Sequence, residues 1–154
     1  MNLYDWAVRH GVSQAALDEL ISASVKGDHH DRDAIPRSEA YVQSIVRVEA
    51  AAHGVHLWRN NVGGGVLESG SFVRWGLAND SESLNKVLKS SDLIGWRSLR
   101  AIDGNVIAQV VCRECKPEGW IWGATPREQA QLAWINMVNA AGGDACFVTG
   151  KGSF

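Results

Sequence analysis

Three charged residues in the second half of the chain have the spacing of a site that acts on phosphate. Glu114 and Lys116 are separated by one residue at the end of an apolar, strand-like stretch, and Asp92 opens the apolar stretch before it. Side chains at positions i and i+2 of a strand point to the same face of a sheet. We therefore expect Glu114 and Lys116 to project together, and a hairpin would bring Asp92 beside them.

Two adjacent carboxylates form a site for a hard divalent cation such as Mg²⁺. A bound cation polarises a phosphate and lowers the pKa of bound water, and a neighbouring lysine offsets the developing charge. The residues thus predict metal-assisted phosphodiester hydrolysis. A simple ion pair between Glu114 and Lys116 explains the same short pattern. The spacing alone supports the ion pair and the metal site equally.

The elements that would position these residues begin with helices. The pattern of residues 3–26 predicts two short helices separated by Gly11. Ser13 is the expected N-cap of the second helix. Residues 27–36 form a polar linker, in which we interpret His29, His30, Asp31 and Asp33 as a solvated loop. A longer helix is predicted from about Ser38 to Ala52 and ends at Gly54; its expected apolar face is Tyr41, Val42, Ile45, Val48 and Ala52.

The rest of the chain alternates strands, turns and one further helix. Strands are predicted at 55–58, 72–77, 92–96, 106–114 and 145–149, a turn-rich loop at 59–65 and a brief helical turn within 78–91. Asp103 and Gly104 predict a hairpin turn, and a helix is predicted from Pro126 to Ala141 before Gly142 and Gly143. This order predicts an α/β fold with a central mixed β-sheet flanked by helices, preceded by a short N-terminal helical extension. We expect the extension and linker at 1–35 and the main domain at 36–154.

Composition indicates a globular chain without an extreme charge. The 154 residues are 45% hydrophobic and 21% charged, with a net charge of −2. No apolar run reaches the roughly 18 residues that a membrane span needs, so we expect no membrane partner. Residues 57–116 carry 8 basic and 6 acidic residues, so the middle of the chain is the part best suited to a phosphate backbone.

The three cysteines do not predict a disulfide framework. Cys112 and Cys115 form a CxxC motif within a strand-like stretch, and no second CxxC motif is present. We interpret them as buried small residues. The competing hypothesis is a zinc-binding structural protein that uses Cys112, Cys115 and the histidines.

Several segments together suggest a family. They are Glu39–Gln43 leading to Gly54, Arg59–Gly63, Arg74–Leu77, Ser91–Gly95, Glu114–Lys116, and Gln131 followed by Gly142 and Gly143. In order and spacing this set resembles the PD-(D/E)XK nucleases, and within them the VRR-NUC group, the virus-type replication–repair nuclease domains. The resemblance covers roughly residues 37–150. It implies a PD-(D/E)XK, restriction-endonuclease-like core.

The resemblance also implies roles for individual residues. Asp92 and Glu114 match the metal-binding acids, and Lys116 matches the lysine that positions the attacking water. Glu39 matches the acid on the first helix that completes the metal shell. Gln131 matches the glutamine near metal and phosphate. The Cys115 carbonyl is a further expected metal ligand.

Two positions depart from the family pattern, and two other residues compete with these assignments. Ser91 stands where the wider superfamily often has proline, and Cys115 occupies a variable position. Glu49 lies closer to the apolar face of its predicted helix than Glu39, although Glu39 has the family spacing. Gln129 competes with Gln131, and since the two lie on different faces of one helix, at most one should face the site.

The sequence also contains candidate nucleic-acid contacts. Arg59, Asn60 and Asn61 are candidates for contact with the DNA backbone, and turn geometry explains the asparagines equally well. Trp120 and Trp122 would suit base stacking, but we favour a packing role.

The expectation is a Mg²⁺- or Mn²⁺-dependent DNA endonuclease. The resemblance implies a homodimer that acts on branched or junction DNA, in phage replication, recombination or repair, and hence in the host cytoplasm. The alternative is a non-catalytic DNA-binding module that kept the nuclease fold.

Overall fold

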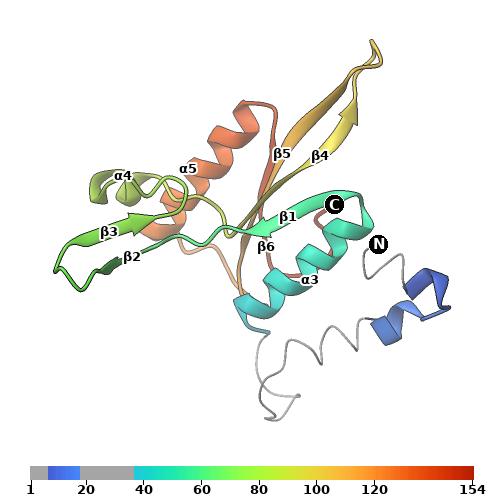
Figure 1. Cartoon of the computed structure of the whole chain (residues 1–154), viewed down its shortest axis with the longest axis horizontal. Helices are drawn as coiled ribbons and strands as arrows, with labels where there is room; N and C mark the ends of the chain where they lie inside the picture. The colour runs from blue at the N-terminus through green and yellow to red at the C-terminus, as the bar shows by residue number, and fades with distance from the viewer. Residues whose placement is uncertain (1–6, 18–36) are drawn as a thin grey trace. The chain divides into compact units, whose positions relative to one another are not determined.

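Strand β5 (Val106–Cys115) is central to the sheet that carries the predicted site residues (Figure 1). The sheet order is β1 (Val55–Arg59), β4 (Leu93–Arg100), β5 and β6 (Asp144–Val148). Neighbouring strands are antiparallel except β5 and β6, which are parallel. Helix α3 (Glu39–Ala52) packs on one face and α5 (Pro126–Ala140) on the other. The predicted α/β class, with a mixed central sheet between helices, is confirmed.

The computed structural model describes residues 7–17 and 37–154, and the chain divides into two units, residues 1–37 and 38–154. In the first unit, residues 7–9 and 14–17 are helical, Gly11 has a φ of 65°, and Ser13 Oγ accepts a hydrogen bond from Ala16 N. The rest of the two predicted helices, and the linker with its histidines and aspartates, lie outside the described residues. No helix in the described ranges has the length and apolarity needed to cross a bilayer.

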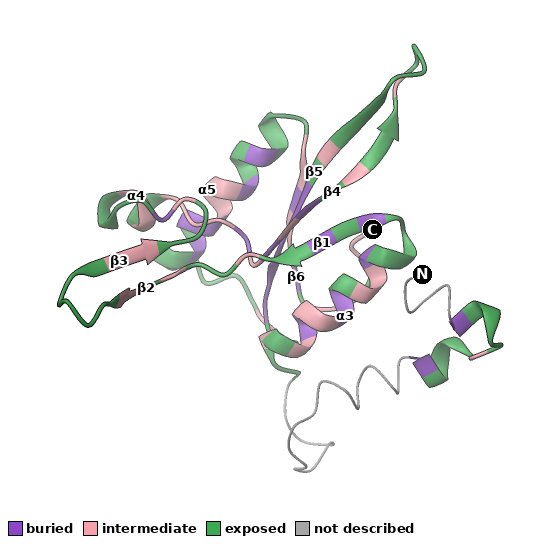
Figure 2. Ribbon diagram, in the orientation of Figure 1, coloured by how far each residue is buried: buried purple, intermediate pink, exposed green. Residues whose placement is uncertain are grey.

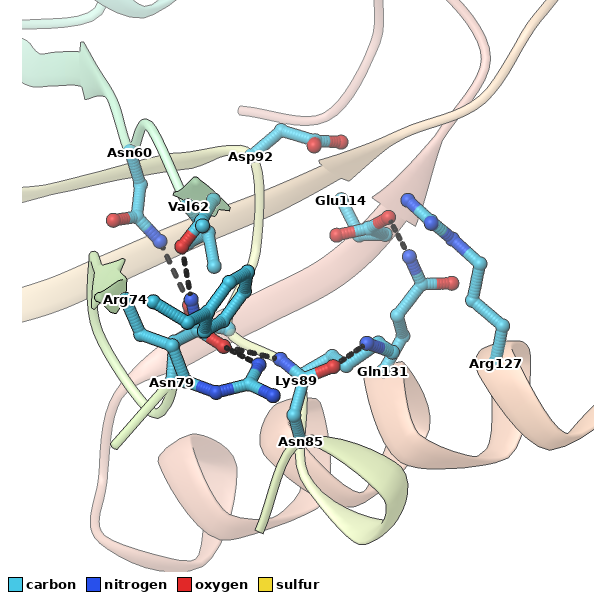
Figure 3. Close-up of a pocket in the computed structure, with 14 residues that line it drawn as sticks. Asn60, Val62, Arg74, Asn79, Asn85, Lys89, Asp92, Glu114, Arg127 and Gln131 are labelled. Atoms are coloured by element: carbon cyan, nitrogen blue, oxygen red, sulfur yellow. Dashed lines mark hydrogen bonds between the residues drawn. The ribbon is translucent and has the colours of Figure 1, made fainter. Parts of the chain in front are cut away.

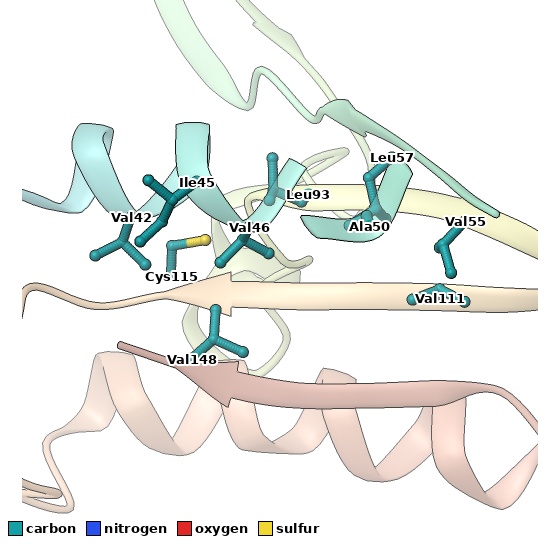
Figure 4. Close-up of a cluster of buried hydrophobic side chains, with 10 residues drawn as sticks. All are labelled: Val42, Ile45, Val46, Ala50, Val55, Leu57, Leu93, Val111, Cys115 and Val148. Atoms are coloured by element: carbon teal, nitrogen blue, oxygen red, sulfur yellow. The ribbon is translucent and has the colours of Figure 1, made fainter. Parts of the chain in front are cut away.

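Helix α3 begins where the sequence predicts. Ser38 Oγ accepts a hydrogen bond from Tyr41 N, and after the helix Gly54 adopts a φ of 69°. Its core-facing residues are Val42, Ile45, Val46 and Ala50, which pack on β1, β4 and β5 (Figure 4). The predicted apolar face was wrong in part, since Ala52 is exposed and Val48 only half-buried. The i, i+4, i+8 row of Val42, Val46 and Ala50 contacts the sheet, and this turns Ala52 away from it.

The segment predicted as a loop at 59–65 contains strand β2 (Gly63–Val66), which pairs with β3 (Phe72–Trp75) as a separate antiparallel hairpin. The loop prediction was therefore wrong for residues 63–65. Glycine has low strand propensity, and packing across the strands overrides it here. A Cβ at Gly63 would lie 2.7 Å from the Trp75 ring, so this ring occupies space that only glycine leaves open. The brief helix expected within 78–91 is α4 (Glu82–Val87).

The long β4–β5 hairpin turns at the predicted residues. Ala101 N donates to Asn105 O at 2.8 Å, and Gly104 has a φ of 86°. Most residues in the half of β5 nearest this turn are exposed, whereas its last five residues are all buried (Figure 2). The register pairs Leu93 with Arg113, which brings the neighbouring residue Asp92 to the end of β5.

Candidate active site

Glu114, Lys116 and Gln131 form a buried, mutually hydrogen-bonded group at the end of β5. Lys116 Nζ lies 3.1 Å from Glu114 Oε1 and donates to Gln131 Oε1 at 2.8 Å. The Gln131 amide nitrogen donates to the same Glu114 oxygen. Glu114 is only 2% exposed, and the other two are also buried. The i and i+2 positions place both charged residues on the face of the sheet that α5 covers, as the spacing predicts.

Helix α5 holds Gln131 in place through its N-terminal cap. Thr125 Oγ1 accepts from Glu128 N at 3.2 Å, and the Glu128 carboxylate accepts from Thr125 N at 2.8 Å. Glu128 also accepts from Trp120 Nε1 at 2.8 Å. These bonds tie the loop after β5 to the start of the helix, and so set the position of the turn that carries Gln131.

Asp92 lies immediately before β4 and reaches the end of β5. Its Oδ2 accepts a hydrogen bond from Cys115 N at 2.8 Å. Burial raises the pKa of Asp92, the Cys115 hydrogen bond opposes this shift, and the charge of Glu39 adds to it. Asp92 is therefore a half-buried carboxylate with a second acid within electrostatic range.

Glu114 has the more strongly perturbed carboxyl group. Burial chiefly, and then the negative charge of Asp92, raises its pKa from 4.5 to about 7, although Lys116 works in the opposite direction. A buried carboxyl group whose pKa is raised by a neighbouring carboxylate favours a bound proton or a nearby cation.

Asp92, Glu114 and Gln131 line one end of a cavity of about 350 Å³ that extends to the β2–β3 hairpin (Figure 3). Three cations also line it: Arg74 from β3, Lys89 from the segment after α4, and Arg127 from α5. In Figure 3, Arg127 and Gln131 reach toward Glu114 from the same helix. The cavity thus combines an acidic pair with basic groups from three elements, an arrangement suited to a phosphate ester held beside a cation.

The structure distinguishes between the competing candidates in each pair, Glu39 or Glu49 and Gln131 or Gln129. The charge of Glu39 acts on Asp92, whereas Glu49 Oε1 accepts a hydrogen bond from Gly152 N at 2.6 Å in the C-terminal segment. Gln129 Nε2 donates to Ala124 O at 2.7 Å, and the side chain does not line the cavity. Glu39 and Gln131 are therefore the members of each pair placed toward Asp92 and Glu114.

The three candidate DNA contacts are not gathered at one place. Asn60 lines the cavity, but its side-chain amide donates to Ser90 Oγ at 2.8 Å and to Ser91 O at 3.0 Å. Asn60 N also donates to Asp92 O at 2.7 Å. Arg59 and Asn61 are exposed and do not line the cavity. Asn60 therefore fastens the segment that carries Asp92, and it does so without positive φ.

The two tryptophans after β5 pack on the end of the sheet. The Trp120 and Trp122 rings lie 5.1 Å and 5.7 Å from the Phe147 ring. Lys116 Nζ lies 5.8 Å from the Trp120 ring centroid and 5.5 Å from that of Phe147. These contacts confirm the packing role, and they give Lys116 an aromatic wall.

The cysteines do not form a zinc site together. Cys112 packs in the cluster beneath α5 and Cys115 in the cluster beneath α3, on opposite faces of β5. Both thiols are buried, and burial raises their pKa values above the ordinary range. The CxxC motif therefore does not supply two ligands to one zinc ion, because residues three apart on a strand point to opposite faces.

Arg127, Lys89, Arg74 and Phe72 line the cavity but were not named from the sequence as site residues. Arg127 had a local signal, since it precedes Gln131 by four residues on one helix and shares its face. The other three come from segments whose position depends on the hairpin and α4. No family model, curated protein or solved structure matches this chain.

Proposed function

We propose that this chain is a metal-dependent DNA endonuclease with a PD-(D/E)XK core, related to the VRR-NUC group. The order α3, β1, β4, β5, α5, β6, with the β2–β3 hairpin and α4 inserted after β1, supports the core assignment. The observation that carries the function is the buried Glu114–Lys116–Gln131 group with Asp92 beside it, in a cavity lined by three cations. A purely structural ion pair between Glu114 and Lys116 would not explain why Asp92 lies beside it or why three cations line the cavity.

The residues fit a hard divalent cation. Asp92 and Glu114 would hold it, with the Cys115 carbonyl and with Glu39 nearby. Within residues 7–17 and 37–154 no three His, Cys, Asp or Glu side chains form one group. Mg²⁺ is commonly bound through one or two carboxylates and keeps several waters. When bound, the ion supplies Lewis acidity and a water of lowered pKa.

The chain's own residues then orient and stabilise the reacting groups. Lys116 is held by Glu114 and Gln131, so its ammonium group can hold a water for attack on phosphorus. The water oxygen would bond to phosphorus and lose a proton to solvent, while the bond to the leaving ester oxygen breaks and that oxygen takes up a proton from solvent. Arg127 and Lys89 offset the charge that builds on the phosphate oxygens.

A cleavage assay tests this function. Labelled single-stranded, duplex, flap and four-way-junction DNA would each be incubated with Mg²⁺, Mn²⁺ or EDTA. We expect metal-dependent cutting that falls about 100-fold or more in Lys116→Ala and Asp92→Ala. Lys86→Ala is the matched control, because Lys86 pairs with Glu82 on the surface and is 71% exposed.

Two results would redirect the assignment. A folded Asp92→Ala protein with full activity would remove Asp92 from the site. No cutting on any substrate, with binding retained, would favour the DNA-binding module that kept the fold. The same preparations also test the proposed homodimer by their mass in solution, and the flap and junction arms test the preference for branched DNA.

A further inference from the structure

The two faces of strand β3 have different surroundings. Alternate residues of a strand point to opposite faces, and Phe72 and Arg74 line the cavity, whereas Trp75 does not. Both aromatic side chains are largely exposed, at 57% for Phe72 and 49% for Trp75. An exposed phenylalanine inside a charged cavity is unexplained by core packing.

Glycine makes room for the Phe72 ring. A Cβ at Gly64 would lie 2.7 Å from Phe72 Cζ, so the ring lies over the bare backbone of β2. The Arg74 guanidinium carbon is 5.1 Å from the Phe72 ring centroid. The ring is thus supported from the hairpin with a guanidinium over it, and aromatic rings and Arg side chains are the groups on which bases stack.

Basic groups connect this platform to the acidic pair. Burial lowers the pKa of Lys89, and the charges of Arg127 and Arg74 lower it further, so Lys89 lies within electrostatic range of both arginines. Lys89 contacts Asn85 Oδ1, and Arg74 contacts Asn79 Oδ1 at 3.5 Å. Within the described part of the chain none of the three forms an ion pair. Like charges gathered in this way favour an anion such as a phosphate.

We propose that the cavity face of the β2–β3 hairpin is a subsite for one unpaired nucleotide of a DNA strand, stacked on Phe72. This rests on the proposed nuclease function and adds the substrate class. The strand's phosphates run past Lys89 and Arg127 to the acidic pair. The cavity of about 350 Å³ is near the lower end of small-ligand sites, so it takes a base that has left the helical stack rather than a duplex.

A double-mutant cycle between protein and DNA tests the subsite. Binding of labelled single-stranded oligonucleotides would be measured by fluorescence anisotropy in EDTA, with an abasic position moved stepwise along the strand. For wild-type protein, one abasic position should raise Kd by about 5- to 150-fold, which corresponds to the usual contribution of one stacked base to the binding free energy. Phe72→Ala should raise Kd for the intact strand similarly and should be insensitive to that abasic position.

Two variants separate stacking from folding. Phe72→Trp keeps a stacking ring and should retain affinity. Trp75→Phe keeps an aromatic ring at Gly63 on the opposite face of the same hairpin and should bind the intact strand as wild type does. Equal losses in Phe72→Ala and Trp75→Phe, or equal losses on intact and abasic strands, would overturn the subsite.

The cycle is independent of cleavage. Cutting by wild-type protein without coupling between Phe72 and any abasic position would overturn the subsite and leave the nuclease proposal standing. Coupling without cutting on any substrate would support the subsite while removing the nuclease function. Failure of wild-type protein to bind single strands would overturn the subsite directly.

Discussion

At the scale of single residues, the end of β5 shows why the identity of each neighbour matters. Glu114 is buried, and Lys116 and Gln131 both donate hydrogen bonds to its Oε1. These two bonds offset the charge of an ionised Glu114 carboxylate. Burial chiefly, and then the charge of Asp92, changes this balance, because together they raise the pKa of Glu114 despite the nearby lysine. The cost of ionising Glu114 is therefore a measurable property of the folded protein.

We predict that stability falls as pH rises from about 4.5 to about 7 in the presence of EDTA. In this window Glu114 is ionised in the unfolded chain but still holds its proton in the folded one. The folded state binds more protons there, so the free energy of unfolding decreases with pH, by a total on the order of 3 kcal/mol. Urea unfolding at a series of pH values measures it.

Glu114→Gln is the control for this titration. Glutamine carries no titrating proton, so this part of the pH dependence should disappear while other groups continue to contribute. An unchanged slope in the variant would assign the effect to different residues.

At the scale of elements, the site depends on how closely strands approach. Asp92 meets Cys115 because the β4–β5 register pairs Leu93 with Arg113, and β1 closes on the other side of β4. Gly95 permits this approach, since a Cβ there would lie 1.7 Å from the carbonyl oxygen of His56. That contact is with backbone and cannot be relieved by a rotamer change.

We predict that Gly95→Ala lowers the free energy of unfolding by about 3 kcal/mol or more, because β1 must move away from β4. Gly150→Ala is the matched control, with no atom within 4 Å of the added carbon. The control should change stability by about 0.5 kcal/mol or less. Denaturant unfolding of both variants measures the difference, and equal stabilities would show that the strands relax at little cost.

At the scale of the whole molecule, the net charge of −2 hides a local arrangement. The cavity brings Asp92 and Glu114 from the sheet together with Arg74, Lys89 and Arg127 from the hairpin, the segment after α4, and α5. Mutual repulsion of the two carboxylates is relieved when a cation binds. Binding should therefore stabilise the whole fold and not only the loops around the cavity.

We predict that Mg²⁺ or Mn²⁺ raises Tm, and that the rise disappears in Asp92→Asn. At a free concentration 100 times Kd, the stabilisation is about 2.7 kcal/mol. Thermal unfolding with each ion and with EDTA measures it. Equal increases in wild-type and variant proteins would place the bound ion elsewhere, and unfolding by EDTA alone would indicate a structural metal instead.

The sequence by itself determined the features that depend on local interactions. Ser38 and Pro126 predicted the starts of α3 and α5, and Asp103 with Gly104 predicted the hairpin turn. The shared face of Glu114 and Lys116 followed from strand geometry, which needs only the i, i+2 spacing. These succeed because caps, turns and side-chain alternation are set within a few residues of chain.

Only the tertiary structure decided the features that join distant segments. Strand β2 exists because aromatic rings of β3 cover its glycines, and the choice of Glu39 over Glu49 depends on what lies across from the helix. Lys89 enters the cavity from a segment with no periodic pattern. The physical reason is common to all three: burial and charge depend on neighbours in space, and those neighbours are far away in the chain.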